Sequence, residues 1–125
     1  MASENIWALP TNPGKLTGIA FDPTYGNIYF GERNPNNIGE INPTNNTLTE
    51  WALPTHSGKL TGVVFDPTSR NIYFGESNPN KIGRLAPATN TFTEWSIANH
   101  PLSILVDPCG NVFFADNIGR LGRHS

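Results

Sequence analysis

Two long stretches of this chain are nearly the same, and this duplication constrains the fold more than any other feature. Residues 7–50 and 51–94 are identical at 30 of 44 positions, and both begin with Trp-Ala-Leu-Pro-Thr. Repeats of this length are typical of proteins built as arrays of similar supersecondary units, each too small to bury its own apolar face. We therefore expect a repeat domain.

A third, more divergent copy begins at Trp95. It keeps an Asp-Pro pair after its first apolar run, an aromatic pair, an acid and an Ile-Gly-Arg-Leu sequence at residues 118–121, but its loops are shorter. With this copy the repeats cover nearly all of the 125 residues. The sequence therefore predicts one domain, residues 1–125, made of three units.

Each repeat contains short apolar segments separated by turn-forming residues. In the first copy these segments are residues 16–23, 26–32, 36–43 and 46–54, and they are bounded by Asn, Gly and Pro. Such β-branched and aromatic runs indicate strands joined by hairpins, and no segment has helical apolar spacing. Four strands per repeat match one blade of a β-propeller, so we expect an all-β fold of four-stranded blades. A β-solenoid is the main alternative, but its coils are usually shorter.

The composition excludes several classes of partner. Charged residues make up 14% of the chain and the formal net charge is −2, so no basic surface for nucleic acid or anionic membrane is expected. No apolar run is long enough to span a membrane, and the first residues do not resemble a signal peptide. We therefore expect no nucleic-acid or membrane partner and, by default, a cytoplasmic protein.

The motif from Ile72 to Leu85, Ile-Tyr-Phe-Gly-Glu-Ser-Asn-Pro-Asn-Lys-Ile-Gly-Arg-Leu, resembles the blade repeat of the streptogramin lyase family, which includes virginiamycin B lyase. The preceding Gly-Val-Val-Phe-Asp-Pro and the following Phe-Thr-Glu-Trp-Ser-Ile extend the resemblance, which covers all three copies. It implies a β-propeller and, in that family, a lyase that opens a cyclic peptide antibiotic with a bound magnesium ion. Family members have more blades in one chain than the three found here.

The chain departs from the family where the catalytic histidines lie, at the start of an inner strand. The matching positions hold Thr17, Thr61 and Leu102, and none of these side chains titrates near neutral pH as a general base must. His56 and His100, in the loops before the second and third repeats, are the remaining weak catalytic candidates. We therefore expect no streptogramin cleavage.

One acid recurs at the end of the second segment of every copy, as Glu32, Glu76 and Asp116. The resemblance matches these positions to metal-binding carboxylates, and oxygen ligands suit Mg²⁺ or Ca²⁺. In a closed ring the acids would form one layer around the axis. Alternatively, each acid accepts hydrogen bonds from backbone N–H groups in its own turn and only shapes the loop.

Polar residues of two loop sets are expected to share one face of the propeller with these acids. The loops before the inner strands carry Asn12, His56 and His100, and the loops after the second strands carry Asn34 and Asn78. A polar central funnel of this kind would bind a small molecule or a glycan.

Three blades leave two apolar faces uncovered, because propellers close with about four blades or more. Residues 4–10 match a fourth strand without a blade, and blade 3 (residues 102–123) lacks a fourth strand, whereas blade 1 (residues 16–54) and blade 2 (residues 60–98) are complete. We therefore expect a homodimer in which residues 4–10 of each chain complete the third blade of the other, giving a six-bladed ring. The alternative is a piece of a larger propeller.

A propeller fold does not specify an activity, so several functions stay open. We favour a binding or scaffold module that assembles into a ring with a polar, acidic funnel. The alternative is a metal-dependent lyase of the virginiamycin B lyase type that acts on a cyclic peptide and uses His56 or His100.

Overall fold

The computed structural model describes residues 4, 6–11, 14–54 and 58–124, and all regular elements in this part are strands. The first sheet contains β1 (Lys15–Phe21), β2 (Ile28–Arg33), β3 (Asn37–Asn42) and β4 (Thr47–Ala52). The second contains β5 (Lys59–Phe65), β6 (Ile72–Ser77), β7 (Lys81–Ala86) and β8 (Thr91–Ser96). The third contains β9 (Pro101–Val106), β10 (Val112–Asp116) and β11 (Leu121–His124). Every sheet is an antiparallel meander, so the expectation of an all-β propeller is confirmed.

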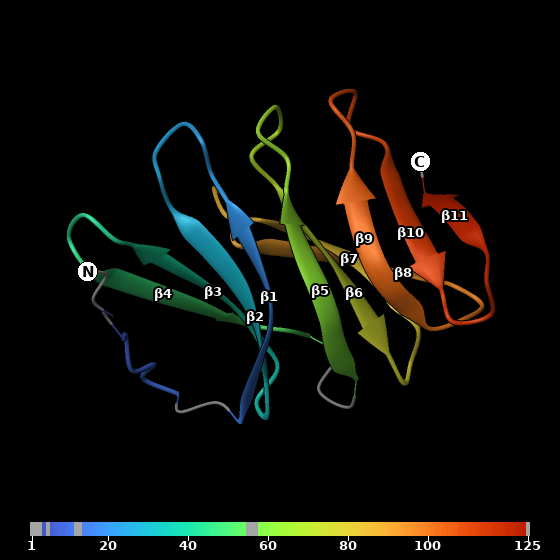
Figure 1. Ribbon diagram of the computed structural model, residues 1–125, viewed down its shortest axis with the longest axis horizontal. Helices are drawn as coiled ribbons and strands as arrows, with labels where there is room; N and C mark the ends of the chain where they lie inside the picture. The colour runs from blue at the N-terminus through green and yellow to red at the C-terminus, as the bar shows by residue number, and fades with distance from the viewer. Residues whose placement is uncertain (1–3, 5, 12–13, 55–57, 125) are drawn as a thin grey trace.

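The three sheets, which we call blades 1, 2 and 3, are arranged as a fan around their first strands. Strands β1, β5 and β9 lie side by side, with β1 against β5 and β5 against β9 (Figure 1). The N- and C-terminal ends lie at opposite sides of the fan (Figure 1). The described part contains no helix with the length and apolarity that crossing a membrane requires.

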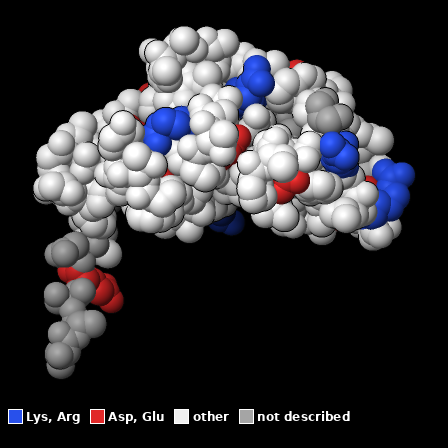
Figure 2. Space-filling view, turned by 90° about the horizontal axis from the view of Figure 1, so that it is seen from above, with Lys and Arg blue, Asp and Glu red and all other residues white. Residues whose placement is uncertain are grey.

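The Asp-Pro pairs explain where the inner strands end. Asp22, Asp66 and Asp107 each accept a hydrogen bond from the backbone N–H two residues later, at 2.9, 3.0 and 2.9 Å. This turn reverses the chain after each inner strand. On the face that carries these turns, basic and acidic side chains are scattered among uncharged residues, and neither sign forms a continuous patch (Figure 2).

A glycine opposite a phenylalanine fixes the register of the second and third strands in each blade. A Cβ atom at Gly39, Gly83 or Gly122 would lie 2.2–2.3 Å from the ring of the phenylalanine on the neighbouring strand. In the third blade, Gly122 is the glycine that lies against the phenylalanine, and this corrects the alignment of the third repeat with the other two. Gly122 takes the place of Gly83, whereas Gly119 lies in the turn before β11 with φ +86°. The Ile-Gly-Arg-Leu sequence at 118–121 is therefore not the counterpart of residues 82–85.

The apolar core is divided between the two contacts that neighbouring blades make. Between blades 1 and 2, Tyr29 and Ile38 of blade 1 pack with Leu60, Val63 and Phe74 of blade 2. A second cluster joins blade 2 to blade 3. An ion pair adds to the first contact, because Arg70 Nη2 of blade 2 lies 2.5 Å from Oδ2 of Asp22, which is fully buried. Each blade is therefore stabilised mainly by its neighbours and not by a core of its own.

Candidate functional site

The starts of the inner strands define one position that is repeated in all three blades. Lys15 is paired with Arg33 and Lys59 with Ser77 at the first rungs of their ladders. In blade 3 the carbonyl oxygen of His100 accepts a hydrogen bond from Asn117 N at 3.0 Å, which gives His100 the equivalent place. We call the surface around Lys15, Lys59 and His100 the mouth of the propeller.

A cavity of about 240 Å³ opens at the mouth between blades 1 and 2. It is lined by Gly14, Lys15, Arg33, Asn34, Asn36 and Lys59. The guanidinium of Arg33 is positioned by the next blade, because its Nε donates to the carbonyl oxygen of Leu60 at 2.8 Å. Three cationic side chains and two amides thus line the cavity, and no acid is among these residues. The local charge favours an anionic ligand.

The asparagines after the second strands divide into two roles. Asn36 donates through Nδ2 to the Gly58 carbonyl, and Asn80 donates to the Ala98 carbonyl at 3.5 Å. These bonds tie each loop to the segment that leads into the next blade. Asn34 and Asn78 occupy left-handed backbone positions, with φ of 58° and 53°, and Asn34 lines the cavity.

Of the other proposed ligand-binding residues, His100 is half-buried at the mouth. Asn12 and His56 lie outside the described residues.

The two repeated glutamates lie inside the blades' contacts and form carboxyl pairs. Glu32 and Glu76 are fully buried, and a second acid lies near each of them, Glu50 near Glu32 and Glu94 near Glu76. Burial, together with the nearby carboxyl of Glu50, raises the pKa of Glu32 to about 7. Burial raises the pKa of Glu76 to about 9, again with a contribution from a second acid, Glu94. Each carboxyl pair therefore holds a proton more tightly in the folded chain than in the unfolded chain, because two adjacent buried carboxylates would repel each other if both were ionised.

The third acid, Asp116, behaves differently. It accepts hydrogen bonds from the backbone N–H groups of Ile118 and Arg120 and from Arg120 Nε, at 3.1, 2.9 and 2.8 Å. Burial opposes ionisation, but these bonds outweigh it and lower the pKa of Asp116. In the described part of the chain, no three His, Cys, Asp or Glu side chains converge in a way that could hold a metal ion. Asp116 therefore matches the alternative in which the acid shapes its own loop.

The positions of the family's catalytic histidines hold no titratable group. A Cβ atom at Gly31 or Gly75 would lie 2.6 Å from the hydroxyl of Thr17 or Thr61, so both threonines lie against the neighbouring strand of their own blade. Leu102 is 55% exposed. None of these three side chains can accept a proton in an elimination near neutral pH.

Sequence reasoning places Arg33 on the face that carries the acids but misses the two lysines that add to its charge at the mouth, Lys15 and Lys59. Lys15 and Lys59 stand in the same Gly-Lys-Leu-Thr-Gly sequence of the first two copies, and this repetition was the available signal. The partners of the buried acids, Glu50 and Glu94, precede a tryptophan in both copies. That repetition did not indicate that Glu50 lies near Glu32, or Glu94 near Glu76, in the folded blade.

Comparison with known proteins supports the architecture. No protein-family model and no curated protein matches the chain. A crystal structure of a nidogen/laminin complex is similar with a TM-score of 0.74 and 19% identity, over 87% of this chain and 46% of the other. A chain of the mitotic checkpoint complex is similar with a TM-score of 0.72 and 9% identity, over 99% and 41%.

A structural genomics protein of unknown function from Bacteroides thetaiotaomicron VPI-5482 is also similar, with a TM-score of 0.66 and 19% identity, over 82% and 30% of the two chains. This chain therefore spans less than half the length of the structures that it resembles. At these identities the likeness shows the propeller fold alone.

Proposed function

We propose that this propeller is a binding module whose ligand is a small anion, carrying a carboxylate or phosphate group, held at the mouth between blades 1 and 2. The observation that carries the proposal is the cavity lined by Lys15, Arg33 and Lys59 together with two amides. Lys15 and Lys59 are exposed, so their ammonium groups can move to meet an anion. The amides would orient the ligand by accepting or donating hydrogen bonds.

The geometry favours this proposal over a metal site formed by the repeated acids. Glu32 and Glu76 have raised pKa values and are buried between strands, and Asp116 is paired with Arg120 at 2.8 Å. A hard cation requires ionised, accessible oxygen ligands. The relationship to streptogramin lyases, and with it the alternative of a metal-dependent lyase, rests on the repeated motif. A lyase of this type would need a general base to remove a proton, and Thr17 and Thr61 do not supply one.

Binding of inorganic phosphate and of succinate, measured by isothermal titration calorimetry in low salt, tests the proposal. We expect saturable binding of at least one of these anions. We expect the double variant Lys15→Gln/Lys59→Gln to weaken it by tenfold or more, because two of the three cations are removed. Affinity should also fall as the salt concentration rises.

Arg84→Gln is the matched control, since it removes one cation that lies over Trp95, at 5.4 Å from the ring centre, and not at the mouth. It should leave anion binding unchanged. Binding of Mg²⁺ or Ca²⁺ without binding of either anion would overturn the proposal and favour the acidic funnel.

A further inference from the structure

The exposed apolar side chains of this chain gather at its two end blades. Ten large hydrophobic residues are exposed in the described part, and all belong to the N-terminal segment, blade 1 or blade 3. Blade 2, whose sequence is nearly that of blade 1, exposes none. Blade 2 has a neighbour on each side, so the exposure of the same positions in blade 1 reflects the lack of a neighbour. Apolar surfaces of this kind mark interaction sites.

Inside the chain, each blade gives the next one three apolar side chains from equivalent ladder positions. The set that blade 1 gives to blade 2 is Ala20, Tyr29 and Ile38. The set that blade 2 gives to blade 3 is Val64, Tyr73 and Ile82. At these ladder positions blade 3 carries Leu105, Phe113 and Leu121. Leu105 and Leu121 are 60% and 77% exposed, so no blade in the described part of the chain covers these two side chains.

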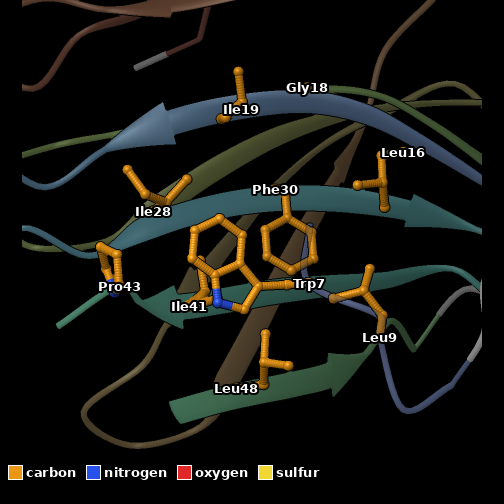
Figure 3. A pocket seen from close by; sticks show the side chains of 10 residues that line it. All are labelled: Trp7, Leu9, Leu16, Gly18, Ile19, Ile28, Phe30, Ile41, Pro43 and Leu48. Atoms are coloured by element: carbon orange, nitrogen blue, oxygen red, sulfur yellow. The ribbon is translucent and has the colours of Figure 1, made fainter. Parts of the chain in front are cut away.

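The surface that receives such a set of side chains is also present on blade 1, where no blade of the described chain covers it. A groove of about 460 Å³ runs over the open face of blade 1, and Trp7, Leu9, Ile19, Phe30, Ile41 and Leu48 are among its lining residues (Figure 3). The residues 44 positions later in blade 2 are Trp51, Leu53, Val63, Phe74, Leu85 and Phe92. Four of these counterparts belong to the core cluster that contains Tyr29 and Ile38, and the other two, Trp51 and Phe92, pack against it. The groove is thus a second copy of a surface that accepts a preceding blade.

The N-terminal segment already lies where the fourth strand of that preceding blade would lie. Trp7 Nε1 donates to Asn46 Oδ1 at 2.9 Å, and Trp51 Nε1, on β4, donates in the same way to Asn90 Oδ1 at 2.7 Å. Trp7 is therefore placed against blade 1 as β4 is placed against blade 2. Blade 3 has only three strands in the described part, and no described strand pairs with the outer edge of β11.

We propose that a second copy of this chain occupies the groove, with Leu105, Phe113 and Leu121 of each chain packed on blade 1 of the other. The N-terminal segment of each chain would then pair with the free edge of β11 in its partner. Each chain carries both surfaces, so a two-fold axis forms both contacts at once and leaves neither open. Two copies give six blades, within the range of about four to eight in which propellers close.

Sedimentation equilibrium of the purified chain over a wide range of concentrations tests this inference. We expect the wild type to be a dimer that dissociates on dilution. The variant Leu105→Ser/Leu121→Ser should weaken dimerisation by at least a hundredfold. Both side chains are exposed in the single chain, so circular dichroism should show the same strand content for the variant as for the wild type at high dilution.

Tyr25→Ser is the matched control. Tyr25 is 68% exposed but stacks on Arg70 of its own chain, 4.5 Å from the ring centre, and should not affect dimerisation. A wild type that stays monomeric at all concentrations would overturn the proposal and would indicate that another occupant, such as further blades or a different protein, covers these faces. Open-ended oligomers, or a double variant that dimerises like the wild type, would also overturn it.

Discussion

Replacing Glu76 by glutamine is expected to stabilise the protein at neutral and alkaline pH. The pKa of this carboxyl is raised from its ordinary value of 4.5 to about 9 by burial and by the carboxyl of Glu94. Between these two values the folded chain binds more protons than the unfolded chain, so the free energy of unfolding falls as the pH rises. The stabilising contribution is fully present below about pH 4.5 and is lost by about pH 9.

Glutamine resembles the protonated form of Glu76 and does not ionise, so the variant does not lose stability as the pH rises through this range. At pH 8 we expect an increase in the free energy of unfolding on the order of a few kcal/mol, and a rise in Tm of roughly 5–10 °C. At pH 4 the variant and the wild type should unfold alike. Thermal unfolding followed by circular dichroism at both pH values measures the difference.

Glu32→Gln provides a graded comparison for this effect. Its pKa is raised only to about 7, so its stabilisation at pH 8 should be smaller. Glu4→Gln, at an exposed position, should change nothing. A Glu76→Gln variant that is less stable than the wild type at pH 8 would show that Glu76 is ionised and needed in that form.

Deletion of residues 1–10 is expected to abolish the proposed dimer. The deletion removes Trp7, whose burial contributes on the order of 2–3 kcal/mol, and the backbone hydrogen bonds of the exchanged strand, at about 0.5–1.5 kcal/mol each. Each ring contains two exchanged strands, so the deletion removes this stabilising free energy twice. Without these contacts the truncated chain should not dimerise, and it should aggregate or unfold more readily than the dissociated wild type, because it also lacks Trp7 and Leu9, which line the groove of blade 1.

Analytical ultracentrifugation of the truncated and full-length chains measures this effect. The single variant Trp7→Ala should show the same trend with a smaller magnitude. A truncated chain that forms the same dimer as the full-length chain, or that remains a well-folded monomer while the full-length chain is also monomeric, would contradict the strand-exchange account.

The propeller could be predicted from the sequence because its repeats are so similar. Identity at 30 of 44 positions, with turn-forming residues between the strands of each copy, leaves few other architectures for such a chain. The third copy was harder to predict. Its shortened turn moves the motif at 118–121 out of register, and only the packing of Phe114 over Gly122 shows which glycine is the true counterpart.

The candidate site was predicted less well, for a physical reason. The sequence shows that an acid recurs at positions 32 and 76, but not which acids are brought together by the pairing of β2, β3 and β4. That pairing places Glu50 near Glu32 across one strand, which turns an expected open ligand into a buried carboxyl pair. The cationic mouth likewise depends on the contact between blades 1 and 2, which no single repeat reveals.

A disulfide designed between the two ends of different chains tests the central claim most directly. In blade 2 Lys81 of β7 is paired with Ser96 of β8, and the same rung in the proposed ring joins Arg120 of one chain to Ala8 of its partner. Residues directly opposite each other on neighbouring antiparallel strands are close enough for a disulfide. The two ends lie at opposite sides of one chain, so the bond can form only between chains (Figure 1).

The measurement is made on the variant Ala8→Cys/Arg120→Cys in a Cys109→Ser background, oxidised in dilute solution and analysed by mass under non-reducing, denaturing conditions. The account predicts a discrete covalent dimer with two disulfides, which returns to single chains on reduction. Free thiols in an unlinked chain, or a ladder of longer covalent oligomers, would contradict closure of the propeller by two copies.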